Sequence, residues 1–170
     1  MKTKFNFITL ILLFLMTFGQ YATAQNQPKE AFIKVEGEVT KPMTLTATDL
    51  SKMKRVDAVM KDRDGKENNY SGVSVYDILK LAGVTMDKEL HGENLSKYLM
   101  VRAGDGYEVL FSLAELDPNF TDRVIILADQ IDGKPLPLTK GLFRIIVPGE
   151  KKPARCIFEV THFIIRFAKE

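Results

Sequence analysis

Hydrophobic and polar residues alternate along much of the chain, which is the pattern of strands that have one face in water. The alternation is clear over residues 31–39, where apolar residues are interleaved with lysines and glutamates. Residues 98–103 and 107–113 are strand-like on either side of a Gly-Asp-Gly turn, so they predict a hairpin. Further strands are predicted at 124–128, 142–147 and 156–167.

One apolar stripe in the middle of the chain has helical spacing instead. Between Val75 and Ala82, four apolar residues recur at positions i, i+3, i+4 and i+7, which predicts a helix with one buried face. Gly83 follows directly, and glycine commonly ends a helix in the left-handed conformation. Ser74 and Asp77 have the spacing of a capping box, so the helix is expected to begin there.

The same capping-box spacing occurs at two other places. Thr46 with Asp49, and Ser112 with Glu115, each predict a short helix that follows a strand. Strands therefore dominate, short helices punctuate them, and regular strand–helix–strand repeats are missing. This pattern predicts an α+β fold with mixed, mainly antiparallel sheets and short helices.

Residues 55–61 and 66–70 are strand-like and flank the turn sequence Asp62-Arg63-Asp64-Gly65. An Asp-Gly pair between two such runs favours a hairpin. The spacing of the two aspartates also suggests a calcium loop, but that loop needs more oxygen ligands and a late glutamate, and Glu67 comes too early. We interpret the motif as a turn, and His91 as a solvated loop residue without a second metal ligand nearby.

The start of the chain has the features of a secretion signal. Lys2 and Lys4 precede a mostly apolar run, and Ala22-Thr23-Ala24 is a small-x-small cleavage site. A membrane anchor is the alternative, but it needs about 20 apolar residues, and this run is shorter and interrupted. The predicted organisation is a signal peptide at 1–24, a flexible leader at 25–30 and one domain at 31–170, exported to a periplasm or to the outside and without a stable membrane anchor after cleavage.

Charge and cysteine content narrow the function classes. The chain has 24 basic and 22 acidic residues, and the signal contains two of the lysines, so the mature part has 24 − 2 = 22 of each. A neutral domain without a basic stripe gives no support to a nucleic-acid partner. Cys156 is the only cysteine, so we expect no internal disulfide and a buried thiol in the last strand. The motifs of serine hydrolases, zinc proteases and phosphate-binding loops are missing.

Several short motifs occur in an order that is typical of one enzyme family. They are Gly37 with Pro42, Asp49-Leu50, Tyr70-Ser71-Gly72-Val73, Leu81-Ala82-Gly83-Val84, Asp105-Gly106-Tyr107, Ile126-Leu127-Ala128, Asp132-Gly133-Lys134-Pro135-Leu136-Pro137 and Arg144-Ile145-Ile146-Val147-Pro148-Gly149. Together they resemble the oxidoreductase molybdopterin-binding domain family of sulfite oxidase type, in its compact, stand-alone exported form. The resemblance covers residues 32–165 and implies the fold of that domain.

The resemblance breaks at the metal ligand. In catalytic members of the family, one cysteine thiolate on the strand before the central helix binds molybdenum, and the matching residues 56–63 contain no cysteine. We therefore expect an exported module without a cofactor that binds a small-molecule ligand or an exported partner protein. The alternative is a molybdopterin-dependent oxidoreductase or redox subunit that holds the cofactor without a cysteine.

A ligand pocket is expected where the hairpin meets the central helix and the Asp105 turn. Arginine suits planar anions, and aromatic rings offer stacking faces. The candidate ligand-binding residues are Arg63, Tyr70, Arg102, Asp105, Tyr107, Arg144 and Arg155. Each also has a simpler interpretation as a turn, strand or solvated surface residue, and no catalytic or metal-binding residue is predicted.

Overall fold

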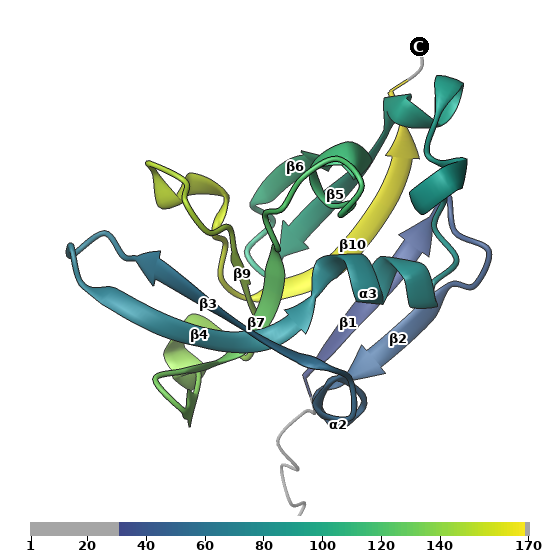
Figure 1. Ribbon diagram of the computed structural model, residues 1–170. Coiled ribbons are helices and arrows are strands. Elements are labelled where there is room, and N and C mark those ends of the chain that lie inside the picture. Colours follow the sequence, from purple (N-terminus) through teal and green to yellow (C-terminus); the bar gives the residue numbers. More distant parts are fainter. Residues whose placement is uncertain (1–30, 169–170) are drawn as a thin grey trace, which may run out of the picture.

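The computed structural model describes residues 31–168 and arranges them as two β-sheets with short helices (Figure 1). Sheet A contains, in spatial order, β2 (Met43–Thr46), β1 (Phe32–Gly37), β10 (Val160–Phe167), β5 (Lys97–Ala103) and β6 (Glu108–Ser112). Sheet B contains β3 (Arg55–Lys61), β4 (Glu67–Ser74), β7 (Ile126–Ile131) and β8 (Lys134–Pro135), and β9 (Arg144–Ile146) also pairs with β7. The described strand pairs are antiparallel except β1 with β10, so the predicted α+β class is confirmed.

Sheet A has a dry face and a wet face because its strands alternate as predicted. In β1, Ile33 and Val35 are fully buried, whereas Lys34 and Glu36 form an ion pair of 2.7 Å on the opposite face. The C-terminal strand β10 lies between β1 and β5, where Val35 is paired with Phe163. A slip of one residue would turn the buried side chains to water, so burial determines the register.

The central helix α3 (Val75–Leu81) follows β4 directly, and its predicted apolar stripe is fully buried. Gly83, just past its end, has a φ of 70°, as the sequence predicts. The capping box predicted at Ser74 is wrong, because the Ser74 side chain makes no hydrogen bond at the helix start. The N–H group of Val75, the first residue of the helix, donates to the Ile125 carbonyl at 2.9 Å, so a tertiary contact satisfies one of the unpaired groups at the helix start.

The other two capping boxes are present. Thr46 caps α2 (Ala47–Ser51), and Ser112 caps the single turn η3 (Leu113–Glu115), each with the reciprocal acidic side chain. The remaining helical turns are η1 (Asp87–Glu89), η2 (Gly92–Ser96), η4 (Leu138–Lys140) and η5 (Pro153–Arg155).

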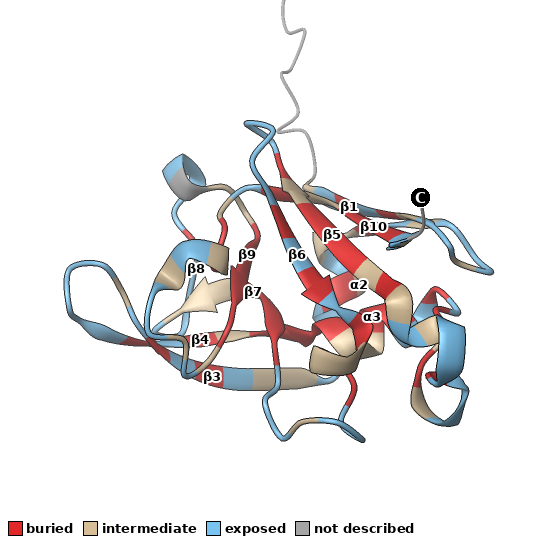
Figure 2. Ribbon diagram, turned by 90° about the horizontal axis from the view of Figure 1, so that it is seen from above, coloured by how far each residue is buried: buried red, intermediate tan, exposed pale blue. Residues whose placement is uncertain are grey.

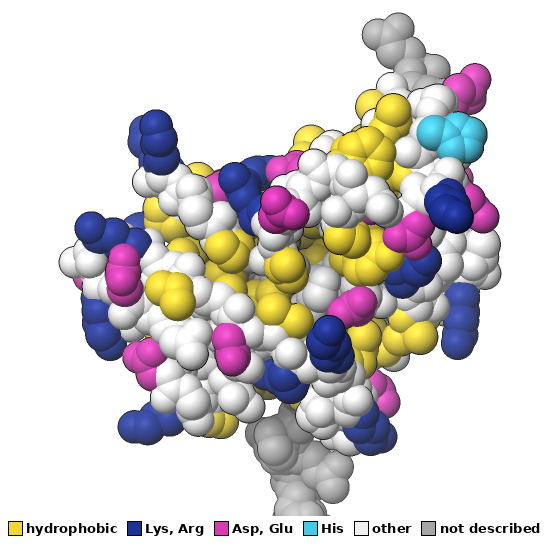
Figure 3. Space-filling model, in the orientation of Figure 1, with side chains coloured by type: hydrophobic (Ala, Val, Ile, Leu, Met, Phe, Trp, Pro, Cys, Tyr) yellow, Lys and Arg dark blue, Asp and Glu magenta, His cyan; other side chains and the backbone are white. Residues whose placement is uncertain are grey.

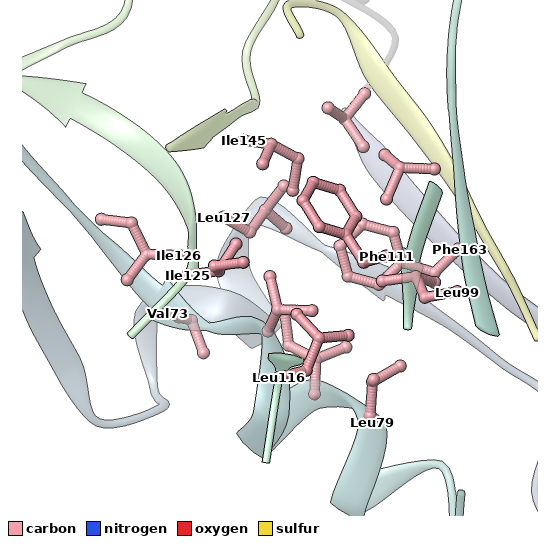
Figure 4. Close-up of a cluster of buried hydrophobic side chains, with 14 of the residues drawn as sticks. Val73, Leu79, Leu99, Phe111, Leu116, Ile125, Ile126, Leu127, Ile145 and Phe163 are labelled. Carbon is pink, nitrogen blue, oxygen red and sulfur yellow. The ribbon is translucent and has the colours of Figure 1, made fainter. Parts of the chain in front are cut away.

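The hydrophobic core lies where the two sheets and α3 meet (Figure 2). Figure 4 shows side chains from both sheets and the helix gathered there, among them Val73, Leu79, Phe111, Leu127 and Phe163. Full burial of each such side chain contributes about 1.5–3 kcal/mol. This packing holds segments that are far apart in the sequence side by side.

The last strand is shorter than the sequence pattern predicts. β10 begins at Val160, and Cys156 lies before it, directly after η5. The physical reason is Glu159, whose φ of 53° is incompatible with a strand, so the chain turns there. Cys156 is buried as predicted, although it is not part of a strand.

Two predictions concern segments at the start of the chain. The signal peptide at 1–24 and the leader at 25–30 lie outside the described residues. Within residues 31–168, no helix has the length and apolar character needed to cross a membrane.

Candidate functional site

A cavity of about 600 Å³ lies where the tip of the β3–β4 hairpin, the β5–β6 turn and residues 153–159 meet. Figure 1 shows the hairpin tip and the segment before β10 on the same side of the molecule. The expected position beside the central helix is corrected, because α3 does not line the cavity. β4 has eight residues, and at about 3.3 Å per residue it separates the hairpin tip from the helix by about 26 Å.

Arg144 of β9 forms a buried part of the cavity wall. Its guanidinium lies 3.9 Å from the centroid of the Phe158 ring and 5.1 Å from that of the Tyr70 ring. One Nη group pairs with Asp62 at 2.9 Å, and Nε donates to the Cys156 carbonyl at 3.3 Å. The other Nη group donates to the Tyr70 hydroxyl. Stacking and hydrogen bonds therefore hold this cation in one orientation.

Asp62, at the end of β3, is the counter-charge of Arg144. Its Oδ2 accepts the Tyr70 hydroxyl and the Asn68 amide, each at 2.6 Å. Burial raises the pKa of Asp62, but hydrogen bonds from Tyr70 and Arg144 and the Arg144 charge outweigh burial and hold this pKa below its usual value. Burial and the hydrogen bond to Asp62 raise the pKa of Tyr70, so its hydroxyl stays neutral.

Asn68 of β4 completes the buried polar wall and is 5% exposed. Its amide nitrogen donates to Asp62, which determines the orientation of the amide group. Within the part of the chain that the structure describes, its Oδ1 is the one buried side-chain nitrogen or oxygen atom without a hydrogen-bond partner. Such an atom costs about 1–3 kcal/mol, and a donor from a ligand or water would recover part of that cost.

The rim of the cavity is more acidic than basic. Three cations and four carboxylates line it, so its formal charge is 3 − 4 = −1. They are Arg63, Lys66 and Arg144, and Asp62, Asp64, Asp105 and Glu159. Figure 3 shows Lys and Arg side chains next to Asp and Glu on the hairpin side of the molecule.

Five of the seven candidate ligand-binding residues gather at this cavity. Arg63, Asp105, Tyr107 and Arg144 line it, and Tyr70 lies buried behind them against Arg144. They come from the β3–β4 turn, β4, β9 and the β5–β6 turn, and only the packing of the sheets brings them together. Whether they bind a ligand stays a prediction.

Two candidates lie outside the cavity lining. Arg102 pairs with Glu108 at 2.7 Å on sheet A. It lies outside the cavity because successive strand residues point to opposite faces, and its neighbour Ala103 lines the cavity. Arg155 is held by Glu115 at 3.0 Å and by Glu150, which occupy its guanidinium.

Sequence reasoning missed four residues of the wall. Asp62 was expected only as a turn residue, and Asn68, Phe158 and Glu159 were not singled out. The sequence did contain a signal for Asp62. Asp62 directly precedes the candidate Arg63 in the hairpin turn, so both side chains could be expected near the same cavity. Glu159 had no such signal, since the residues beside it in the structure, Gly104 and Gly141, lie far away in the sequence.

Comparison with known proteins gives a likeness in structure only. No family model matches the chain, and no curated protein does. Among solved structures, the chain is similar to the sulfane dehydrogenase SoxCD from Paracoccus pantotrophus, with a TM-score of 0.62 and 18% sequence identity. The match covers 82% of this chain and 39% of that chain. At this identity the likeness shows the fold alone, and it agrees with the predicted fold of sulfite oxidase type.

The cavity residues do not fit a thiolate-bound molybdenum cofactor. Residues 56–63, which match the thiolate-bearing part of the resembled family, contribute Asp62 and Arg63 to the lining, and the Asp62 carboxylate is occupied by Arg144. Cys156 also lines the cavity, but its Sγ accepts the Val147 N–H at 3.4 Å. Burial raises the pKa of Cys156, so it remains a neutral thiol, whereas such a metal takes a thiolate. Within residues 31–168, no cluster of three or more His, Cys, Asp or Glu side chains could hold a metal.

Proposed function

We propose that this chain is an exported binding module that holds a small organic molecule in the cavity beside the hairpin tip. The observation that carries the proposal is the cavity of about 600 Å³, whose wall contains the hydrogen-bonded side chains of Asp62, Asn68 and Arg144, the last two of them buried. Cavities of about 300–1,000 Å³ with a few fixed polar groups are typical of small-molecule sites. The aromatic rings of Tyr107 and Phe158 add apolar surface to the lining.

Binding is favoured over catalysis because the buried polar groups of the wall are chemically inactive near neutral pH. Asp62 is neutralised by Arg144, and the Tyr70 hydroxyl keeps its proton. Among the described residues that line the cavity there is no histidine, the side chain that most often transfers protons near pH 7. The buried groups of the wall can therefore orient a ligand by hydrogen bonds without exchanging protons with it.

A molybdopterin-dependent redox subunit is the second candidate, because the fold is of the sulfite oxidase type and Cys156 lines the cavity. The protonated state and buried position of that thiol count against this second candidate. The test of both candidates starts from protein isolated from the exported fraction of its native host.

Elemental analysis for molybdenum and tungsten, a pterin fluorescence assay and native mass spectrometry should be applied to that sample. We expect no stoichiometric metal, and a small organic molecule that denaturation releases. The Asn68→Leu variant should lose the molecule, whereas the control Glu108→Gln, which changes an exposed residue outside the cavity, should retain it. Stoichiometric metal with pterin would refute the proposal, and so would equal retention by the Asn68→Leu variant.

A further inference from the structure

The charges around the cavity indicate which class of molecule it binds, and this inference rests on the binding function proposed above. Asp62 and Arg144 neutralise each other, and Lys66 faces Asp132 at 3.4 Å. Within the described chain, Arg63 has no hydrogen-bond or ion-pair partner. Three carboxylates of the lining also have no cationic partner in residues 31–168, namely Asp64, Asp105 and Glu159. The remaining formal charge is 1 − 3 = −2.

Two of these carboxylates flank one turn. The Gly104 N–H donates to the Glu159 carbonyl at 2.8 Å, and a Cβ on Gly104 would lie 3.5 Å from the Glu159 carboxylate. Asp105 is the next residue, and its Oδ1 accepts the Tyr107 N–H at 2.9 Å, which leaves Oδ2 available. Asp105 of the β5–β6 turn and Glu159 of the segment before β10 therefore lie close together in the cavity lining.

An aromatic face lies beside these carboxylates. The Tyr107 side chain belongs to the cavity lining, and the residue is 52% exposed. Its hydroxyl donates to the Ala154 carbonyl at 3.4 Å, so the ring bridges the two segments that border the cavity. A cation over such a ring gains about 0.5–1 kcal/mol at an exposed site.

The buried part of the wall points to the same chemistry. Asn68 lines the cavity and its buried Oδ1 has no hydrogen-bond donor among the described residues, so a ligand N–H group that reached it would supply one, whereas an anion with acceptor atoms alone would not. We propose that the ligand is an organic cation that carries N–H groups, such as an amine, amidine or guanidine. Glu159 and Asp105 hold its charge, and the Tyr107 ring packs against its apolar part.

Three probes of one shape and different charge test this inference by calorimetry on the purified protein. They are benzamidine, benzamide and benzoate, with charges of +1, 0 and −1. We expect benzamidine to bind most tightly and benzoate least tightly, and we expect added salt to weaken benzamidine because the carboxylates are exposed. Glu159→Gln should weaken benzamidine by about tenfold or more, the value of a lost charge-assisted hydrogen bond.

Two further variants test the direction of the charge effect on benzamidine binding and provide a control outside the cavity. Arg63→Gln removes the cation beside the site, so it should strengthen benzamidine binding. Glu108→Gln, outside the cavity, should change it by less than about twofold, because exposed ion pairs contribute little.

Each other result would overturn the inference. Benzoate binding more tightly, and weakening in Arg63→Gln, would show an anion site and leave the binding function intact. If benzamidine bound equally well to the Glu159→Gln variant, its site would lie outside this cavity. Failure of all three probes to bind would also overturn the inference. The binding function itself fails only if protein from the native host releases no small molecule.

Discussion

Replacement of Asp62 by asparagine should destabilise the protein because it isolates a buried cation. The Arg144 side chain is 4% exposed and pairs with Asp62 at 2.9 Å. Removing one partner of a buried ion pair costs about 3–5 kcal/mol. The Asp62 side chain is 19% exposed at the cavity, and asparagine can still accept a hydrogen bond from the Tyr70 hydroxyl. We therefore expect the free energy of unfolding to fall by about 3 kcal/mol, the lower end of that range.

Urea unfolding followed by far-UV circular dichroism measures this loss, since the chain has no tryptophan for fluorescence. Asp57→Asn on the same strand is the matched control, because Asp57 is exposed, and it should cost less than about 0.5 kcal/mol. A loss at Asp62→Asn no larger than that of the control at pH 7 would refute the reasoning.

The same variant has a defined pH dependence. The pKa of Asp62 in the folded protein lies below its usual value, so its contribution to stability is complete above about pH 4. The contribution is lost as the pH falls through the folded-state pKa, where the carboxyl becomes protonated. The difference in unfolding free energy between wild type and Asp62→Asn should therefore shrink below about pH 4. A difference that stays constant there would contradict the assignment.

Three other predictions test the fold. Thr46→Ala should cost about 1 kcal/mol in thermal unfolding and Ser74→Ala less than half of that, since only Thr46 caps its helix; equal losses would contradict this. Gly72→Ala should prevent folding or cost far more than Gly133→Ala, because its Cβ would lie 2.1 Å from a carbonyl oxygen of β7, whereas Gly133 has open space; similar expression and melting points would disprove it. Cys156 should react slowly with a disulfide reagent until guanidinium unfolds the chain, because burial raises its pKa; rapid labelling of the native protein would show an accessible thiol.

The sequence predicted helices and turns well where the interactions that form them join residues close together in the chain. The buried stripe of α3, the Asp-Gly hairpin after β3 and the capping box at Thr46 each depend on residues within a few positions of one another. The box at Ser74 failed for the opposite reason. The Ser74 side chain makes no cap hydrogen bond, and the contact found at the helix start is a tertiary one, from the Val75 N–H group to the carbonyl of the distant Ile125.

The arginines show why the site could not be predicted in the same way. In the sequence, Arg63, Arg102, Arg144 and Arg155 are equivalent candidates for binding an anion. In the structure, carboxylates from other segments occupy the last three, and only Arg63 faces the cavity without a partner in the described chain. For this reason we propose a cationic ligand, although arginine in the sequence suits planar anions.

The amino-acid sequence by itself determined which segments become strands and helices and which of their faces are buried, because periodicity and turn chemistry act over a few residues. Only the tertiary structure decided the composition of the cavity. Asp62 ends a hairpin strand, Arg144 lies in β9 and Glu159 precedes β10, and they share one cavity because the hydrophobic core packs two sheets together. Hydrophobic packing is not directional, so no local pattern records which polar groups it will bring into contact.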